Sequence, residues 1–357
     1  MVYSLKLMKR TVNMNIYLPD GWLDVAEISN QPQFIKTIIG GRGIGKTYGV
    51  LSYAYDKICP SPDCIVENEK FILLRTTKTE AEFLYQKDFN PFKTLNTDRG
   101  INVSCERLNE YMGIFFIEKE DGEKAVIGYV LALSTVAKIR GFDASDCQRI
   151  IYDEFIPESH IQKLKNSGMA LLNAYETVNR NRELKGKKPV ELWLLSNSND
   201  LDNDIMLELD ILSLHDKIKN HYAANDNILL IEPADSPISY RKAATGIYAL
   251  SRNFNKMSLN NEFVGHYEGN VRSMNLKNGA VWIQYDNLYF YSFKDSNLVY
   301  CTMYKKPKEQ PLYKYGDTTF ENKKFKTECH SLFNFYLTGN MFFENSKCEA
   351  LFNKIWE

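Results

Sequence analysis

Short hydrophobic runs alternate with segments of mixed polarity through the first 200 residues of the chain. Several of the runs are short and apolar, which is typical of strands buried in a parallel sheet. They cover residues 34–39, 71–75, 125–133, 149–152 and 191–195. Helices are predicted between them, over residues 48–58, 79–88 and 167–182. This alternation predicts an α/β domain whose parallel sheet is covered on both faces.

The alternation of strands and helices is interrupted in two places. Residues 112–117 and 125–130 flank a polar turn at 118–124, which predicts a β-hairpin. After residue 197 the composition shifts to Asn, Asp and Ser, and later the chain carries aromatic strands and a helix pair. The strands are predicted at 281–285, 288–293 and 298–303, and the helices at 328–337 and 345–356. We therefore expect a first domain over residues 1–200, a linker region over 201–225 and a smaller α+β domain over 226–357.

Composition and charge narrow the classes of function. The 357 residues carry 44 basic and 45 acidic side chains, so no strong overall field draws the protein to nucleic acid or an anionic membrane. The seven cysteines are scattered, with no CxxC pair, which favours free thiols in a reducing compartment. No run of 18 apolar residues occurs and no signal sequence is evident, so we expect a soluble intracellular protein without a membrane partner.

The first chemical motif lies between the strand at 34–39 and the helix that follows it. Residues 40–47, GGRGIGKT, match the phosphate-binding loop G-x-x-x-x-G-K-[ST] at every fixed position. The alternative, a glycine-rich turn that matches by chance, does not explain the strand before it and the helix after it. Such a loop cradles phosphates with backbone N–H groups, while its lysine binds the β- and γ-phosphates and its hydroxyl binds Mg²⁺. The predicted nucleotide-binding residues are Gly40, Gly41, Arg42, Gly43, Ile44, Gly45, Lys46 and Thr47.

A second motif is the apolar strand at 149–152 followed by Asp153 and Glu154. Strands that end in solvated carboxylates are common, but a phosphate loop about a hundred residues upstream favours a Walker B site. Asp153 would then hold Mg²⁺ together with Thr47, and Glu154 would activate the attacking water. A water-activating glutamate favours ATP hydrolysis over transfer to another acceptor.

Further polar residues are predicted at the same carboxyl edge of the sheet, where ligands lie in open α/β folds. Ser196 and Asn197 end the strand at 191–195, and either a γ-phosphate sensor or an ordinary turn explains them. The basic residues near this edge are either ligand contacts or solvated loop positions, and two arginines at a helix end either complement the helix dipole or act as an arginine finger, often supplied by another subunit. These candidates are Arg75, Lys78, Arg140, Arg180 and Arg182.

Four motifs occur in the order and spacing of a known family: GGRGIGKT, IIYDEF, TVNRNRE and LLSN. With residues 256–265, they make the chain resemble the DNA-packaging ATPases of small tailed phages of the phi29 type, over about residues 30–300. The resemblance implies a ring motor, with a pentamer expected, that docks at the portal of an empty capsid. It would drive double-stranded DNA inward by ATP hydrolysis with Mg²⁺, in the host cytoplasm and transiently on the assembling capsid. In phi29 a structural RNA joins motor and capsid, and the sequence leaves open whether this chain uses one.

The same resemblance implies roles for individual residues. It assigns Glu154 to catalysis, makes Arg180 the first candidate for an arginine finger and Arg182 the second, and suggests subunit contacts for Lys78 and Arg140. The match around Arg75 is looser.

Larger terminases carry a ribonuclease-H-like nuclease after the ATPase. Here Asp286 and Asp295 lie in predicted turns and the strand interiors hold no acidic residues. The second domain is therefore expected to be a ribonuclease-H-like fold without a nuclease site.

Two other functions use part of the same evidence. A cellular-type translocase or helicase would have the same hydrolytic site. An ATP-binding assembly factor would not require Glu154. DNA-stimulated ATP hydrolysis and dependence on an empty capsid separate the three.

Overall fold

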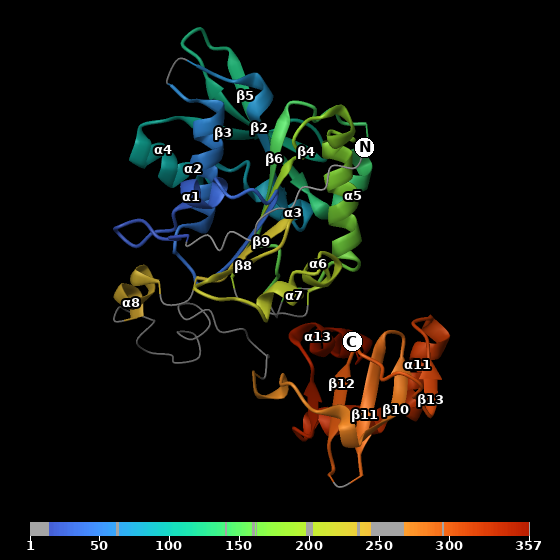
Figure 1. Ribbon diagram of the computed structural model, residues 1–357. Coiled ribbons are helices and arrows are strands. Elements are labelled where there is room, and N and C mark those ends of the chain that lie inside the picture. Colours follow the sequence, from blue (N-terminus) through green and yellow to red (C-terminus); the bar gives the residue numbers. More distant parts are fainter. Residues whose placement is uncertain are drawn as a thin grey trace.

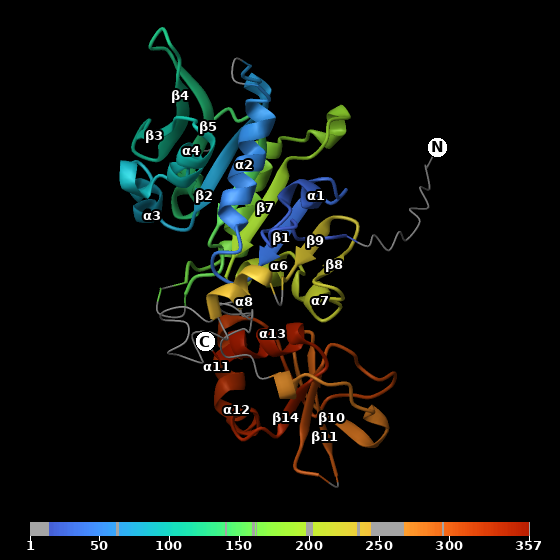
Figure 2. The same ribbon diagram turned by 90° about the vertical axis from the view of Figure 1, so that its left-hand side faces the viewer.

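The computed structural model describes residues 14–61, 64–139, 141–158, 161, 163–197, 203–233, 236–243, 268–294 and 296–356. These residues form two units, each built on its own β-sheet, as Figures 1 and 2 show. The first unit carries a nine-stranded sheet and the second a five-stranded sheet. No described helix has the length and apolar character needed to cross a bilayer.

The nine-stranded sheet has the order β3-β4-β5-β2-β6-β7-β1-β9-β8. Its centre is parallel, because β5, β2, β6, β7, β1 and β9 pair in that sense. In chain order its strands are β1 (Ile35–Ile39), β2 (Lys70–Arg75), β3 (Val103–Arg107), β4 (Met112–Glu118), β5 (Lys124–Ala132), β6 (Cys147–Asp153), β7 (Glu191–Ser196), β8 (Tyr222–Ala224) and β9 (Ile228–Ile231). The predicted parallel α/β sheet is therefore present, and the predicted hairpin is β4–β5.

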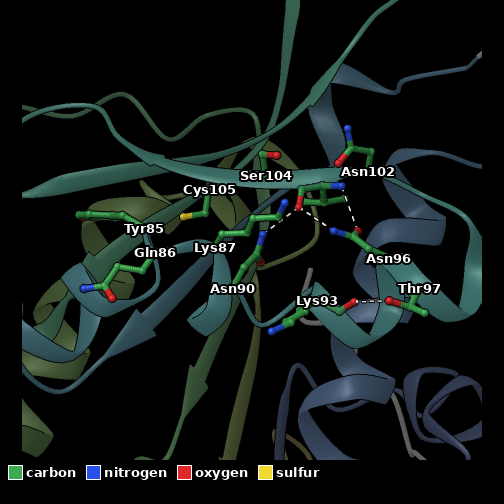
Figure 3. A pocket seen from close by; sticks show the side chains of 11 residues that line it. Tyr85, Gln86, Lys87, Asn90, Lys93, Asn96, Thr97, Asn102, Ser104 and Cys105 are labelled. Atoms are coloured by element: carbon green, nitrogen blue, oxygen red, sulfur yellow. Dashed lines mark hydrogen bonds between the residues drawn. The ribbon is translucent and has the colours of Figure 1, made fainter.

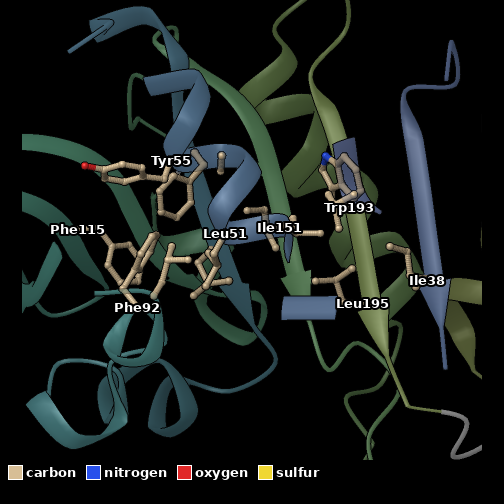
Figure 4. Close-up of a cluster of buried hydrophobic side chains, with 14 of the residues drawn as sticks. Ile38, Leu51, Tyr55, Phe92, Phe115, Ile151, Trp193 and Leu195 are labelled. Atoms are coloured by element: carbon tan, nitrogen blue, oxygen red, sulfur yellow. The ribbon is translucent and has the colours of Figure 1, made fainter. Parts of the chain in front are cut away.

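Helices cover both faces of this sheet, because neighbouring residues of its buried strands point to opposite sides. One face packs Ile38, Trp193 and Leu195 against Leu51 of α2, as Figure 4 shows. The other packs strand residues against Leu171 and its neighbours in α5. The helices of the unit are α1 (Val25–Ser29), α2 (Lys46–Ile58), α3 (Lys78–Phe83), α4 (Lys93–Arg99), α5 (Ser167–Asn179), α6 (Asp204–Glu208), α7 (Leu212–His215) and α8 (Pro237–Ala243).

The structure corrects the expected domain boundary. Residues 203–225 do not form a linker, since α6 and α7 bury Ile205, Met206 and Leu212 in the core beneath the large sheet. The first unit also continues past residue 226, because β9 pairs in parallel with β1. The apolar run at 228–231 is short, and its place is decided by this pairing with a strand near the start of the chain.

The second unit is a mixed sheet with the order β13-β10-β11-β12-β14. The predicted aromatic meander is confirmed as three antiparallel strands, β10 (Gly279–Tyr285), β11 (Leu288–Phe293) and β12 (Val299–Thr302). Two short strands, β13 (Tyr313–Tyr315) and β14 (Met341–Phe343), extend the sheet in parallel at its edges. The helices are α11 (Thr319–Glu328), α12 (His330–Leu337) and α13 (Ser346–Trp356). The core around Phe325 is rich in aromatic rings.

Helix α13 joins the two units, lying next to α6 and α7 in both views. Ser346 donates to Asp216 across 2.6 Å, and Lys347 pairs with Asp210 across 2.6 Å. Ala350 is buried against the core of the first unit. The second unit is therefore attached to the side of the first that carries α6 and α7.

Candidate functional site

The loop at residues 40–47 connects β1 to α2, as predicted. Gly43 and Gly45 have φ values of 72° and 91°, a left-handed conformation that glycine adopts without strain. Gly45 immediately precedes α2, whose first residue is Lys46. Gly43 and Gly45 therefore let the chain turn sharply and direct the N-terminus of α2 at the loop, the arrangement that binds phosphate.

Lys46 is buried within this loop. Its ammonium group donates to the carbonyl oxygens of Gly40 and Gly41 across 2.7 and 2.8 Å, and to Oδ1 of Asn197 across 3.1 Å. Burial lowers the pKa of Lys46 to about 8, against the opposing charges of Asp153 and Glu154. A buried cation placed at a loop of backbone dipoles favours an anionic ligand.

The carboxylates at the end of β6 meet the loop as the sequence predicted. Thr47 Oγ1 donates to Asp153 Oδ1 across 3.0 Å. Glu154 lies beside them in a left-handed backbone conformation, φ 59°, which is uncommon for residues other than glycine and is found at strained functional positions. The side chain of Glu154 is 63% exposed and is thus accessible to water.

Arg75, at the end of β2, connects the two carboxylates. Its guanidinium group is 3.0 Å from Asp153 and 3.2 Å from Glu154. Sequence analysis placed Arg75 at the correct edge of the sheet but did not predict this bridge. The neighbouring threonines precede the next helix, α3, and the N–H groups of Thr76 and Thr77 donate to Glu80 in its first turn.

Ser196 and Asn197 have separate places. The Ser196 hydroxyl is buried and lies 3.3 Å from both the N–H and the C=O of Ile156, so it links β7 to the segment after β6. Asn197 contacts Lys46 directly. Of the two predicted sensor candidates, Asn197 is the one whose side chain reaches the phosphate loop.

The oxygen donors of this site fit a magnesium ion. Mg²⁺ is usually held by one or two protein oxygens together with water and substrate phosphates, and Thr47 with Asp153 supplies such a pair. In the described part of the chain, no three His, Cys, Asp or Glu side chains gather as a metal cage. A metal at this edge would therefore depend on a phosphate ligand.

The two candidate arginine fingers differ in their surroundings. Arg180 follows α5 with φ 44°, and its side chain is 45% exposed. It donates to the carbonyl oxygen of Phe142 across 2.7 Å and pairs with Asp143 across 3.4 Å. Arg182 is 8% exposed and donates to the carbonyl oxygen of Cys147 across 2.6 Å. Arg182 thus supports the start of β6, whereas Arg180 is presented at the surface.

The remaining basic candidates lie elsewhere. Lys78, at the start of α3, pairs with Glu110 across 3.3 Å and stacks on the ring of Tyr111. Its contacts are with the β3–β4 turn and not with the phosphate loop. Arg140, together with residues 256–265, lies outside the described residues.

Two contacts to the phosphate loop were not predicted from the sequence. Arg42 pairs with Glu158, from the segment after β6. Lys242 of α8 lies 3.3 and 3.4 Å from the carbonyl oxygens of Arg42 and Gly43. Neither Glu158 nor Lys242 belongs to a recognisable sequence motif. Their positions beside the loop follow from the packing of the segments after β6 and β9.

A separate hollow of about 540 Å³ lies between residues 85–90, α4 and the edge strand β3 (Figure 3). Tyr85, Lys87 and Cys105 line it, and both Asn90 and Asn96 donate to the carbonyl oxygen of Val103. Five strands lie between β3 and β1 in the sheet order, so this hollow is not part of the loop site. Its asparagines hold β3 in place.

Comparison with known proteins gives a consistent assignment. The family model for the Podovirus DNA encapsidation protein (Gp16) matches residues 21–355. The DNA packaging proteins of Bacillus phages PZA and phi29 are each 29% identical over 236 residues, which is 65% of this chain. The matched part spans 63% of the length of those relatives.

Solved structures share the fold. The bacteriophage Phi-29 viral genome packaging motor assembly contains a chain with a TM-score of 0.66 and 20% identity, over 94% of this chain and 98% of that one. The Phi-28 gp11 DNA packaging motor gives a TM-score of 0.60 and 19% identity, over 92% and 95% of the two chains. Both units and their order along the chain therefore have counterparts in solved structures.

Proposed function

The chain belongs to the Podovirus DNA encapsidation protein (Gp16) family, and on this basis we propose that it is an ATP-driven motor that moves double-stranded DNA into an empty phage capsid. The proposal combines the family membership with the chemistry of the loop site. The fold shared with the phi29 motor assembly supports it.

The observation that carries the ATPase assignment is the meeting of two motifs that are about a hundred residues apart in the sequence. Thr47 Oγ1 and Asp153 Oδ1 lie 3.0 Å from each other, with Lys46 and Glu154 as their immediate neighbours. Enzymes of phosphoryl transfer use this arrangement, in which a phosphate loop between a strand and a helix lies beside a second strand that ends in a carboxylate.

The residues divide the work of hydrolysis. The backbone of residues 40–47 and the Lys46 ammonium group bind the β- and γ-phosphates. Glu154 accepts a proton from the attacking water, and the Arg75 bridge holds that carboxylate in place. Asn197 accepts a hydrogen bond from Lys46, so it is positioned to respond when the γ-phosphate leaves.

Thr47 and Asp153 would hold Mg²⁺, which when bound neutralises charge on the phosphate oxygens. The Thr47–Asp153 contact brings the two oxygen ligands together before the ion arrives.

Arg180 is proposed to act on the ATP of a neighbouring subunit. Its described contacts are with Thr177, Phe142 and Asp143, and not with the phosphate loop of its own chain. An exposed guanidinium after a helix suits an arginine finger supplied in trans. This role requires a ring of copies of this chain, for which a pentamer at the capsid portal is the proposed form.

The second unit is proposed to be a ribonuclease-H-like domain that grips DNA, the portal or a structural RNA and does not cut DNA. The antiparallel meander β10–β12 with the parallel strand β13 beside β10 supports the fold. Asp286 lies in the β10–β11 turn, where it accepts a hydrogen bond from Asn287, and Asp295 lies outside the described residues. The proposed site of action is the host cytoplasm, on the assembling capsid.

The deciding experiment is a packaging assay with purified empty capsids, double-stranded DNA and ATP. We expect Lys46→Ala to abolish ATP turnover and DNA entry, because a methyl group cannot replace a cation on the β- and γ-phosphates. Lys57→Ala, at the exposed end of the same helix, is the matched control and should retain both. Near-normal ATPase activity in Lys46→Ala would remove the phosphate-loop assignment.

The same assay separates the alternatives. DNA-stimulated ATPase activity with strand separation and no need for a capsid would indicate a helicase. ATP binding without DNA-stimulated turnover would indicate an assembly factor.

A further inference from the structure

Helix α8 lies directly against the phosphate loop (Figure 2). The two are far apart in the sequence, since α8 follows β9, the last strand of the large sheet in chain order. Lys242 Nζ is 3.3 Å from the carbonyl oxygen of Arg42 and 3.4 Å from that of Gly43, which is 199 residues away in sequence. A Cβ atom on Gly43 would overlap this ammonium group, so glycine at this position leaves room for it. The loop and α8 are thus fitted to each other.

Two contacts other than Lys242 hold α8 in this position. Arg241 donates to the carbonyl oxygen of Asp20, and Pro237 packs on Gly21. The Asp20 and Gly21 loop is itself joined to the phosphate loop, since the N–H of Leu23 donates to the carbonyl oxygen of Ile44 across 3.2 Å. The position of the helix therefore does not depend on the Lys242 ammonium group alone.

The charges around the loop favour an anion near Lys242. Lys242 and Lys46 approach the same loop, and their like charges repel. Arg75 already pairs with the carboxylates of Asp153 and Glu154. A polyphosphate placed on the loop would relieve the repulsion between the two lysines.

We propose that Lys242 is a second nucleotide-binding lysine, which leaves the carbonyl oxygens of Arg42 and Gly43 to bind a phosphate oxygen of ATP in the same subunit. The inference rests on the proposed function of the loop. Rotation of the flexible lysine stem is sufficient, because the loop that Lys242 touches is the one whose N–H groups bind the phosphates. Bound nucleotide then links the loop to α8 through a phosphate oxygen, and α8 precedes the second unit along the chain.

The alternative is that Lys242 only holds the loop in place through its contacts with the carbonyl oxygens of Arg42 and Gly43. A lysine that only holds the loop stabilises the protein without nucleotide. A lysine that binds a phosphate adds stability only when nucleotide is bound. The two roles therefore predict different effects on thermal stability.

The test measures binding of a fluorescent ATP analogue to the full chain, with ATP, ADP and inorganic triphosphate as competitors. Lys242→Met removes the charge and keeps the stem, and Lys242→Arg keeps the charge. Lys187→Met is the matched control, since it makes the same change at an exposed lysine before β7, away from α8 and the phosphate loop. Thermal unfolding of each variant with and without ATP completes the set.

We expect Lys242→Met to weaken ATP binding roughly tenfold or more, the range for a lost charge-assisted hydrogen bond. Inorganic triphosphate should lose the same factor, because the contact is to phosphate. Lys242→Arg should stay within about threefold and Lys187→Met within about twofold of the parent. The melting temperature of Lys242→Met without ATP should match the parent, while its rise on adding ATP should shrink.

The proposal is overturned if Lys242→Met binds ATP as the parent does, or if Lys187→Met loses as much. It is also overturned if Lys242→Met lowers the melting temperature without ATP and leaves the rise on adding ATP unchanged. Lys46→Ala separates this failure from that of the proposed function. If binding by the parent depends on Lys46 but not on Lys242, only the present inference fails. If the parent does not bind ATP, the loop assignment fails as well.

Discussion

The two sheets of this protein both pack against apolar cores, but they differ in the other side chains that they bring together. In the nine-stranded sheet, Arg75 and Asp153 from the ends of two strands meet Thr47 of the phosphate loop at one edge. In the five-stranded sheet, aromatic rings gather in the interior, with Phe325 among the side chains of Tyr285, Tyr315 and Trp356.

This contrast suggests that the first unit carries out the chemistry and the second serves for attachment. Parallel strands bring their carboxyl ends to one edge, so residues far apart in sequence can form one site there. The aromatic interior of the second unit instead gives a well-packed body, joined to the first through α13. We expect substitutions in the first unit to change turnover and substitutions in the second to change stability or attachment.

The largest effect is expected from Arg180→Ala. A finger acts on charge that develops during phosphoryl transfer, so its loss should reduce turnover roughly a thousandfold with little change in ATP affinity. Steady-state ATPase kinetics and nucleotide binding measure the two quantities. Arg180→Lys is an informative companion, because a lysine lacks the planar fork that a finger uses.

A mixing experiment decides whether Arg180 acts in trans. In rings made from Arg180→Ala and Glu154→Gln subunits, a trans finger lets some sites draw both intact groups from different chains, and activity returns. If subunits exchange and activity does not return, Arg180 does not act in trans.

The next effect concerns the base. Glu154→Gln should reduce turnover roughly a hundredfold or more, because the amide cannot accept a proton from water, while ATP and Mg²⁺ binding persist. Glu176→Gln, an exposed glutamate on α5, is the matched control and should retain normal turnover. Turnover above about a tenth of normal in Glu154→Gln would mean that another group is the base.

A stability change without a catalytic change is expected in the second unit. Phe325 is fully buried, so Phe325→Ala should lower the free energy of unfolding of this unit by about 3–5 kcal/mol. Phe320, on the same helix and 76% exposed, provides the control: Phe320→Ala should cost less than about 0.5 kcal/mol. Denaturant unfolding of the full chain measures both, with ATP affinity expected to stay within about twofold. A large loss of ATP affinity in Phe325→Ala would contradict the separation of the two units.

The smallest effect is expected at Asp286. We predict no Mg²⁺- or Mn²⁺-dependent cleavage of DNA by the full chain, and no change in turnover for Asp286→Asn, because two-metal nucleases need several converging carboxylates. Gel analysis of DNA incubated with each metal is the measurement. Cutting that disappears in Asp286→Asn would show a nuclease site in the second unit.

The sequence by itself determined the elements whose pattern is local. Residues 40–47 carry their own glycines at the positions with positive φ, and five short apolar runs predicted the strands that hold them. The Asp153–Glu154 pair was predicted beside that loop, because parallel strands place their ends at one edge. The aromatic meander was likewise predicted from period and composition.

Only the tertiary structure decided which distant side chains meet. The bridge from Arg75 to Asp153 and Glu154, and the approach of Lys242 to Gly43, join segments that no local pattern connects. The same holds for the boundary of the first unit, which β9 extends by pairing with β1. Local periodicity reports which face of an element is buried, whereas these contacts depend on strand order and on the packing of the segments that follow each strand.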